Sequence, residues 1–149
     1  MRRGFTIVEI VTAIGLLGIL VGLGYAFSFS YLQTQQLRAA GDVVTSELRQ
    51  AQTDAFTQKN DADHGVKIFT DHVVRFQGSS YASRTQAKDV QTDFSLTTTP
   101  SGLGEFVFTA GGLKPTTAGV ATLTFQTHAI DITISPYGIL TLTERTIGG

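Results

Sequence analysis

A single acidic residue lies inside a long apolar run near the N-terminus, and its position is chemically unusual. Glu9 is the only charged residue between Arg3 and Arg38. A carboxylate deep in hydrocarbon costs about 2–3 kcal/mol, and such residues usually mark a function and need a partner. Cleavage just before Phe5 would create an α-amino group, whose pKa of about 7.7–8 keeps it largely cationic near neutrality. The amine of one subunit could therefore pair with Glu9 of its neighbour.

Other residues that could do chemistry are scattered along the chain. Asp61, Asp63 and His64 suggest a metal loop, but the Gly and Glu spacing of a calcium hand does not follow. His72 and His128 stand apart from His64 and from each other, without an HExxH spacing. The sequence has no G-x-S-x-G elbow, no phosphate loop and no cysteine. We therefore expect a non-enzymatic protein that holds neither a metal nor a cofactor.

The charge of the chain gives no general attraction for nucleic acid. The formal net charge is −1, and loss of Met1–Gly4 would leave nine basic and twelve acidic side chains, a net of −3. A groove that follows phosphates needs several basic side chains on one face. We expect no nucleic-acid partner, because the basic residues of the second half are spread out, each near acidic ones: Lys67, Arg75, Arg84, Lys88 and Lys114.

The apolar run from Phe5 to Gly24 has 20 residues, about what a helix needs to cross a hydrocarbon core of ~30 Å. The positive-inside rule would keep Arg2 and Arg3 in the cytoplasm and send the rest of the chain outward. A secretory signal peptide cleaved near Ala26-Phe27-Ser28 and a plain signal anchor are competing interpretations, but neither explains Glu9.

The segment Gly4-Phe5-Thr6-Ile7-Val8-Glu9 closely resembles the cleavage and methylation motif of type IV pilin-like prepilins. The resemblance implies a leader, residues 1–4, that a prepilin peptidase removes between Gly4 and Phe5. It also implies N-methylation of Phe5 and a role for Glu9 in filament assembly. The implied partners are other pilin or pseudopilin subunits and an inner-membrane assembly platform.

Glycines are frequent within this run. Small residues let helices approach closely, and Gly18 and Gly22 have the small-xxx-small spacing. We interpret Gly15, Gly18 and Gly22 as candidate helix-packing positions, although membrane helices also tolerate glycine without such a role.

Helical periodicity continues beyond the run, so we expect one helix over residues 5–59, transmembrane over about 5–29. An apolar stripe of its second half needs a sheet to cover it. The stripe consists of Leu37, Ala40, Val44, Leu48, Ala51 and Ala55.

From Gly65 onward the pattern changes to period two, which predicts strands. Short turns between them favour antiparallel pairing in a globular domain over residues 60–149. The expected fold class is α+β: a long N-terminal helix, transmembrane in its first half and amphipathic in its second, packed on an antiparallel β-sheet. Seven strands are predicted, at 66–69, 72–76, 93–97, 106–109, 120–126, 130–135 and 139–143.

The second half of the chain resembles, more loosely, the H-type minor pseudopilins of type II secretion and the related minor pilins. The resemblance rests on four stretches: Gly65-Val66-Lys67-Ile68, Phe106-Val107-Phe108 followed by Gly111-Gly112, Gly119 preceding Val120–Phe125, and Ile130–Ile134 followed by Gly138. It implies a structural subunit of a secretion pseudopilus, with a type IV pilus subunit for adhesion, motility or DNA uptake as the alternative. A secreted or tethered β-domain that binds a ligand is the third hypothesis. The implied location is the cytoplasmic membrane, single-pass, with the globular domain outside.

Overall fold

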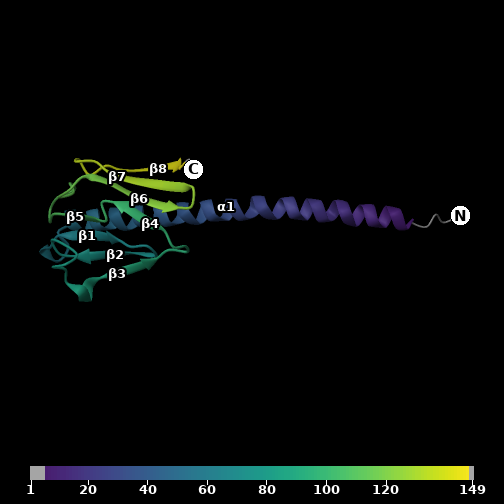
Figure 1. Ribbon diagram of the computed structural model, residues 1–149. Coiled ribbons are helices and arrows are strands. Elements are labelled where there is room, and N and C mark those ends of the chain that lie inside the picture. The colour runs from purple at the N-terminus through teal and green to yellow at the C-terminus, as the bar shows by residue number, and fades with distance from the viewer. Residues whose placement is uncertain (1–5, 148–149) are drawn as a thin grey trace. The chain divides into compact units, whose positions relative to one another are not determined.

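The structure of the protein is a computed structural model that describes residues 6–147, with the backbone alone described for residues 24–30 (Figure 1). The chain forms two compact units, one up to Gln35 and one from Gln36 onward. Helix α1, Ile7–Phe56, is 50 residues long and contributes to both units.

The described part of the first unit consists of Thr6 and the residues of α1 up to Gln35. Its apolar side chains from Ile7 to Leu23 are all exposed. Among the described residues, no helix is long and apolar enough to cross a membrane.

This finding corrects two predictions. The predicted fold class, with a transmembrane first half of the helix over about residues 5–29, is wrong. The predicted single-pass location in the cytoplasmic membrane, with the N-terminus inside and the globular domain outside, is wrong for the same reason.

The second unit is built on the last five to six turns of α1. Every residue of the apolar stripe listed above is at most 2% exposed, because the spacing of three and four places them on one side of the helix. The helix ends at Phe56, and a short 3₁₀ segment, η1 (Lys59–Asp61), follows. Gln58, Asn60 and Asp61 have positive φ angles of 52°, 60° and 50°, which turn the chain out of the helix toward the first strand.

Eight strands form two antiparallel four-stranded sheets. One sheet has the order β3-β2-β1-β5 and the other β4-β6-β7-β8. A second 3₁₀ segment, η2 (Gln86–Lys88), precedes β3. The strand bounds are β1 His64–Ile68, β2 His72–Gln77, β3 Val90–Asp93, β4 Thr99–Gly102, β5 Glu105–Phe108, β6 Gly119–Phe125, β7 His128–Ile134 and β8 Leu140–Thr146.

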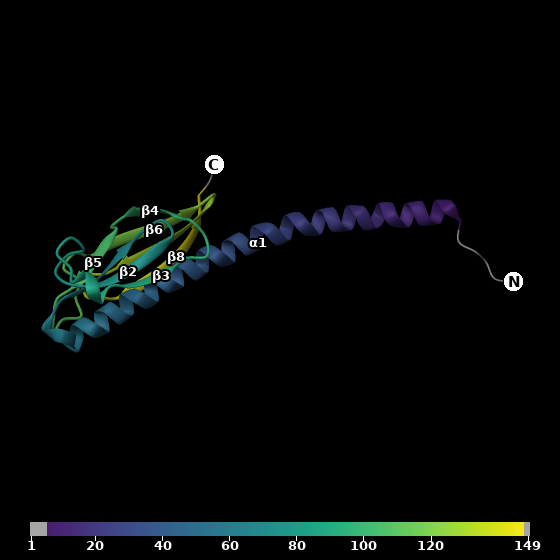
Figure 2. The same ribbon diagram turned by 90° about the horizontal axis from the view of Figure 1, so that it is seen from below.

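Both sheets share one core with the helix. Buried side chains of α1 join those of the first sheet, such as Val66 and Phe106, and of the second, such as Leu123 and Ile132. Figure 2 shows the part of α1 after Gln35 running along one side of the strands. The seven-residue ladders of β6 with β7 and of β7 with β8 continue without a bulge.

The strand predictions differ from the structure mainly between residues 90 and 102. A strand at 93–97 is wrong: the chain there forms β3 at Val90–Asp93 and β4 at Thr99–Gly102, with a connection between them. The division into two sheets was also not predicted, because period-two patterns show which residues face inward and not which strands pair.

Candidate functional site

The predicted processing site cannot be compared with the structure, because Gly4 and Phe5 lie outside the described residues. The described chain begins beside it, at Thr6. The backbone N–H of Glu9 donates to Thr6 Oγ1 at 3.3 Å. Thr6 therefore caps the N-terminus of α1, and Glu9 occupies the position of the acidic residue in a capping box.

Sequence reasoning missed this cap, although Thr-x-x-Glu before an apolar run is a recognisable signature, and the bond uses the backbone N–H of Glu9 and not its carboxylate. A carboxylate in the first turn also interacts favourably with the helix dipole. Across residues 6–147, no basic side chain forms an ion pair with Glu9. Its carboxylate is thus free to meet a cation supplied from elsewhere.

The three predicted packing glycines lie on one stripe of α1, three and four residues apart. A Cβ atom added at Gly15, Gly18 or Gly22 would meet no atom within 4 Å. Nothing in the described chain fills the shallow strip that these glycines leave. The strip is flanked by exposed large apolar side chains, from Ile7 at 81% to Leu23 at 58% exposed.

A helix that is apolar on all sides is normally buried, since exposure of so much apolar surface to water is unfavourable. Residues 7–23 carry such a surface together with Glu9 and the glycine strip. This segment, which we call the assembly segment, is the candidate functional site. Its side chains offer surface for packing and one carboxylate for pairing.

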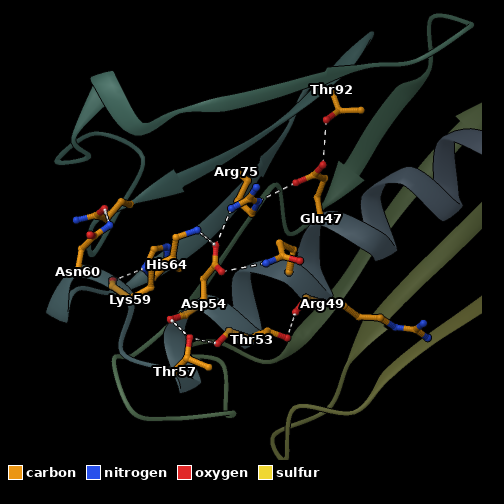
Figure 3. A network of polar contacts seen from close by, with 12 residues as sticks. Glu47, Arg49, Thr53, Asp54, Thr57, Lys59, Asn60, His64, Arg75 and Thr92 are labelled. Atoms are coloured by element: carbon orange, nitrogen blue, oxygen red, sulfur yellow. Dashed lines mark hydrogen bonds and ion pairs between the residues drawn. The ribbon is translucent and has the colours of Figure 1, made fainter.

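A second cluster of polar residues joins α1 to the first sheet, and sequence reasoning did not find it (Figure 3). Arg75 on β2 donates to Glu47 Oε2 at 2.9 Å and to Asp54 Oδ2 at 2.7 Å. Thr92 on β3 donates to the other carboxylate oxygen of Glu47 at 3.0 Å. Lys59 reaches Asp54 Oδ2 at 3.2 Å. The available signal was the seven-residue spacing of Glu47 and Asp54, which places both on one helix face.

Asp54 is the most buried carboxylate of this cluster, with its side chain 6% exposed. Burial alone would raise the pKa of Asp54. Hydrogen bonds from Gln50 and Lys59, and the positive charges of Lys59 and Arg75, outweigh burial and hold that pKa below its ordinary value. The carboxylate is therefore ionised in the folded protein at neutral pH.

A hollow of about 260 Å³ lies beside this cluster, lined among others by His64, Lys88 and Gln77. His64 is buried and its Nε2 lies 2.9 Å from the carbonyl oxygen of Lys59, so it braces the helix-to-strand turn. Asp63 Oδ1 accepts the N–H of Ala110 at 2.9 Å. The structure thus assigns structural contacts to two residues of the sequence segment that resembled a metal loop. In the part of the chain that the structure describes, no group of three or more metal-ligating side chains gathers.

Most of the basic residues weighed as nucleic-acid contacts are held by carboxylates. Lys67 pairs with Glu105 at 3.6 Å, and Arg84 pairs with Asp89 at 2.7 Å while lying over the Tyr81 ring. These two pairs connect neighbouring segments of the first sheet and its loops, whereas Arg75 connects the first sheet to α1.

Comparison of this chain with protein-family models, with curated proteins and with solved structures finds no match.

Proposed function

We propose that this protein is a non-enzymatic structural subunit of a type II secretion-like pseudopilus. Other subunits of the filament would pack against its assembly segment. A prepilin peptidase would cut between Gly4 and Phe5, and Phe5 would be N-methylated. The other partners are further pilin or pseudopilin subunits and the platform that adds them to the filament.

One observation carries the proposal: the assembly segment exposes every large apolar side chain from Ile7 to Leu23. Burying that surface between subunits would stabilise a filament by about 25 cal/mol per Å² of apolar area covered. The open glycine strip at Gly15, Gly18 and Gly22 lets a neighbouring helix approach closely.

Glu9 sets the register in this proposal. Its carboxylate is the one charge in the assembly segment, and the N-terminal amine of a neighbouring subunit is the cation that would neutralise it. A buried carboxylate without a partner is strongly unfavourable, so a neighbour stacked out of register would be rejected.

The processing step is tested by the mass of the mature chain isolated from cells that carry the secretion machinery. A chain that starts at N-methylated Phe5 is expected. A chain that starts near Phe29 would identify a cleaved signal peptide and contradict the proposal.

The assembly step is tested with Glu9→Ala in the same cells. Cleavage should proceed as before, while incorporation into sheared filaments should fall by at least tenfold. Asp71→Asn is the control, because the Asp71 side chain is 64% exposed and lies outside the assembly segment, so its loss of charge is expected to leave incorporation unchanged. Normal incorporation of Glu9→Ala would rule out the charge pairing.

Electron microscopy with an antibody to the globular unit distinguishes the two kinds of filament. Label confined to short structures supports the pseudopilus. Label along long surface fibres would instead make the protein a major or minor subunit of a type IV pilus.

A further inference from the structure

The two sheets have four edges, and three of them are short or blocked. Strands β3, β4 and β5 have four residues each. Pro100 removes a backbone donor from β4, and Asp93 places a charge on β3. The edge of β5 is covered by the next loop, because Thr116 N–H donates to Val107 O at 2.8 Å and Phe108 bridges to Pro115.

The fourth edge, β8, is longer than the other three and its backbone is not covered, although Glu144 and Arg145 place charges near its end. It has seven residues, Leu140–Thr146, without proline, lysine or a bulge. Within residues 6–147, its ladder partner is β7 alone, so its outer row of N–H and C=O groups is open. Large apolar side chains are exposed on it and just before it: Tyr137 is 74%, Ile139 62% and Leu142 36% exposed. A long edge with unpaired backbone groups is a template for another strand.

The space beside β8 is also unfilled. A groove of about 470 Å³ runs between Leu142 and polar side chains of α1, among them Asp42, Thr45 and Arg49. Gly41 brings the helix close to β8 here, since a Cβ at that position would lie 3.2 Å from Leu142 Cδ1. A groove therefore remains between the β8 edge of sheet β4-β6-β7-β8 and the helix.

We propose that this space is taken by the β8 strand of a second copy of the chain, paired antiparallel so that two four-stranded sheets become one eight-stranded sheet. The proposal concerns the globular unit and does not depend on the filament function of the assembly segment.

The two faces of β8 restrict the register. Leu140, Leu142 and Glu144 face the helix, as shown by the contact of Leu142 with Gly41 and the 2.7 Å ion pair of Glu144 with Arg38. Thr143 and Arg145 face the other way, where Arg145 pairs with Asp131. The helix-facing sides of the two β8 strands lie on the same side of the joined sheet only if one residue lies directly opposite the same residue of the copy, because side chains alternate along a strand. We call that residue the position of the symmetry axis.

Charge selects among these registers. An axis at Glu144 or Arg145 would place like charges directly opposite each other, which is destabilising. An axis at Leu142 or Thr143 places Glu144 opposite a leucine of the copy and keeps the charges apart. In that arrangement the inner side chains of the copy face the groove, which holds both Arg49 and Asp42. The axis at Leu142 is favoured, because it sets Glu144 of the copy opposite Leu140, whereas the axis at Thr143 sets it opposite Leu142, close to Gly41 and Asp42. Arg49 has no carboxylate partner among the described residues.

The absence of cysteine gives a clean background for testing the pairing. The full-length protein would carry one cysteine, at Leu142→Cys or Thr143→Cys, with Ser101→Cys on β4 as the control edge. Under mild oxidation, one of the two β8 variants should form covalent dimers at least tenfold faster than the control. Equal rates at β4 and β8 would overturn the proposal, because crowding through the assembly segment would then explain them.

Charges added to β8 distinguish cross-linking through strand pairing from cross-linking through random collision. Thr141 and Thr143 are exposed on the face away from the helix, so Thr141→Lys/Thr143→Lys should preserve the fold and still set basic side chains opposite one another in either register. If Leu142→Cys is the variant that cross-links, this double substitution should lower its cross-linking at least tenfold. If Thr143→Cys is that variant, Thr141→Lys alone, which lies opposite Arg145 of the copy in that register, should have the same effect. Mixing the lysine variant with its counterpart that carries glutamate at the same positions should restore cross-linking in mixed dimers. Failure of either response would overturn the pairing of β8 strands.

Discussion

At the scale of single residues, the most consequential side chain of the globular unit is Arg75. Its guanidinium group, in a side chain 17% exposed, bonds carboxylates on two turns of α1 and so fastens β2 to the helix. A buried ion pair need not stabilise a fold relative to apolar residues, but removal of one partner leaves the other charge buried without compensation, which is destabilising. The helix stripe supplies the packing energy, and Arg75 fixes which side of the helix meets the first sheet.

Arg75→Met is expected to lower the free energy of unfolding by about 3 kcal/mol. The reason is that the buried Asp54 carboxylate would keep Lys59 and Gln50 but lose the positive charge of Arg75. Denaturant unfolding followed by circular dichroism measures the loss. Arg145→Met is the control, since Arg145 is 54% exposed and its pair with Asp131 should contribute less than about 1 kcal/mol. Equal losses in the two variants would show that the position of Arg75 is not special.

The pH dependence of stability follows from Asp54. Its folded-state pKa is lowered, so its stabilising contribution is complete above the unfolded-state pKa of about 3.9 and disappears as pH falls through the folded value. The denaturant concentration at which half of the protein is unfolded should therefore decrease as the pH is lowered below about 4. Asp54→Asn should lower the midpoint at pH 7 and reduce its fall in acid. A variant as acid-sensitive as the parent would assign the effect to other carboxylates.

At the scale of elements, the sequence predicts burial better than pairing. The stripe from Leu37 to Ala55 is buried as its spacing indicates. The predicted strand at 93–97 fails because Phe94 and Leu96 alternate for another reason: they lie in a connection and pack partly buried against the core without a ladder. Strand β4 escapes prediction because Thr99-Pro100-Ser101-Gly102 has the composition of a turn and becomes a strand only by pairing with β6.

The same limit applies to the candidate site. The assembly segment could be predicted, since its composition and Glu9 are local features. The cluster around Arg75 could not, because it joins residues 21 to 45 positions apart in sequence and depends on how β2 and β3 align with the helix.

Strand β1 is expected to be sensitive to a single added methyl group. A Cβ at Gly65 would collide with the Phe76 ring and the carbonyl oxygen of Phe106, so the strand passes its neighbours more closely than any other residue permits. Gly65→Ala should cost about 2–3 kcal/mol in unfolding free energy. Gly104→Ala is the matched control, because its added Cβ would meet only Lys67 Nζ at 3.7 Å. A loss below about 0.5 kcal/mol at Gly65 would mean that the Phe76 ring can move aside.

At the scale of the whole molecule, folding and assembly belong to different parts of the chain. The buried core contains residues from Leu37 onward and none from the assembly segment. The two compact units divide at Gln35, within one uninterrupted helix. The energy that folds the globular unit is therefore independent of the surface that is left for other subunits.

This separation predicts that a fragment spanning residues 33–149 folds without the assembly segment. It should unfold cooperatively and give a circular dichroism spectrum of mixed helix and antiparallel sheet, because it retains the complete core and both sheets. Leu48→Ala in the fragment should cost about 2–5 kcal/mol, since Leu48 is fully buried where the helix meets the sheets. Gln36→Ala, at the boundary of the two units, serves as the conservative comparison within the same helix and should change stability by less than about 0.5 kcal/mol. If the fragment stays unfolded, or if Leu48→Ala does not change its stability, the first unit of the helix takes part in folding. The separation between a unit that folds and a segment that assembles would then be wrong.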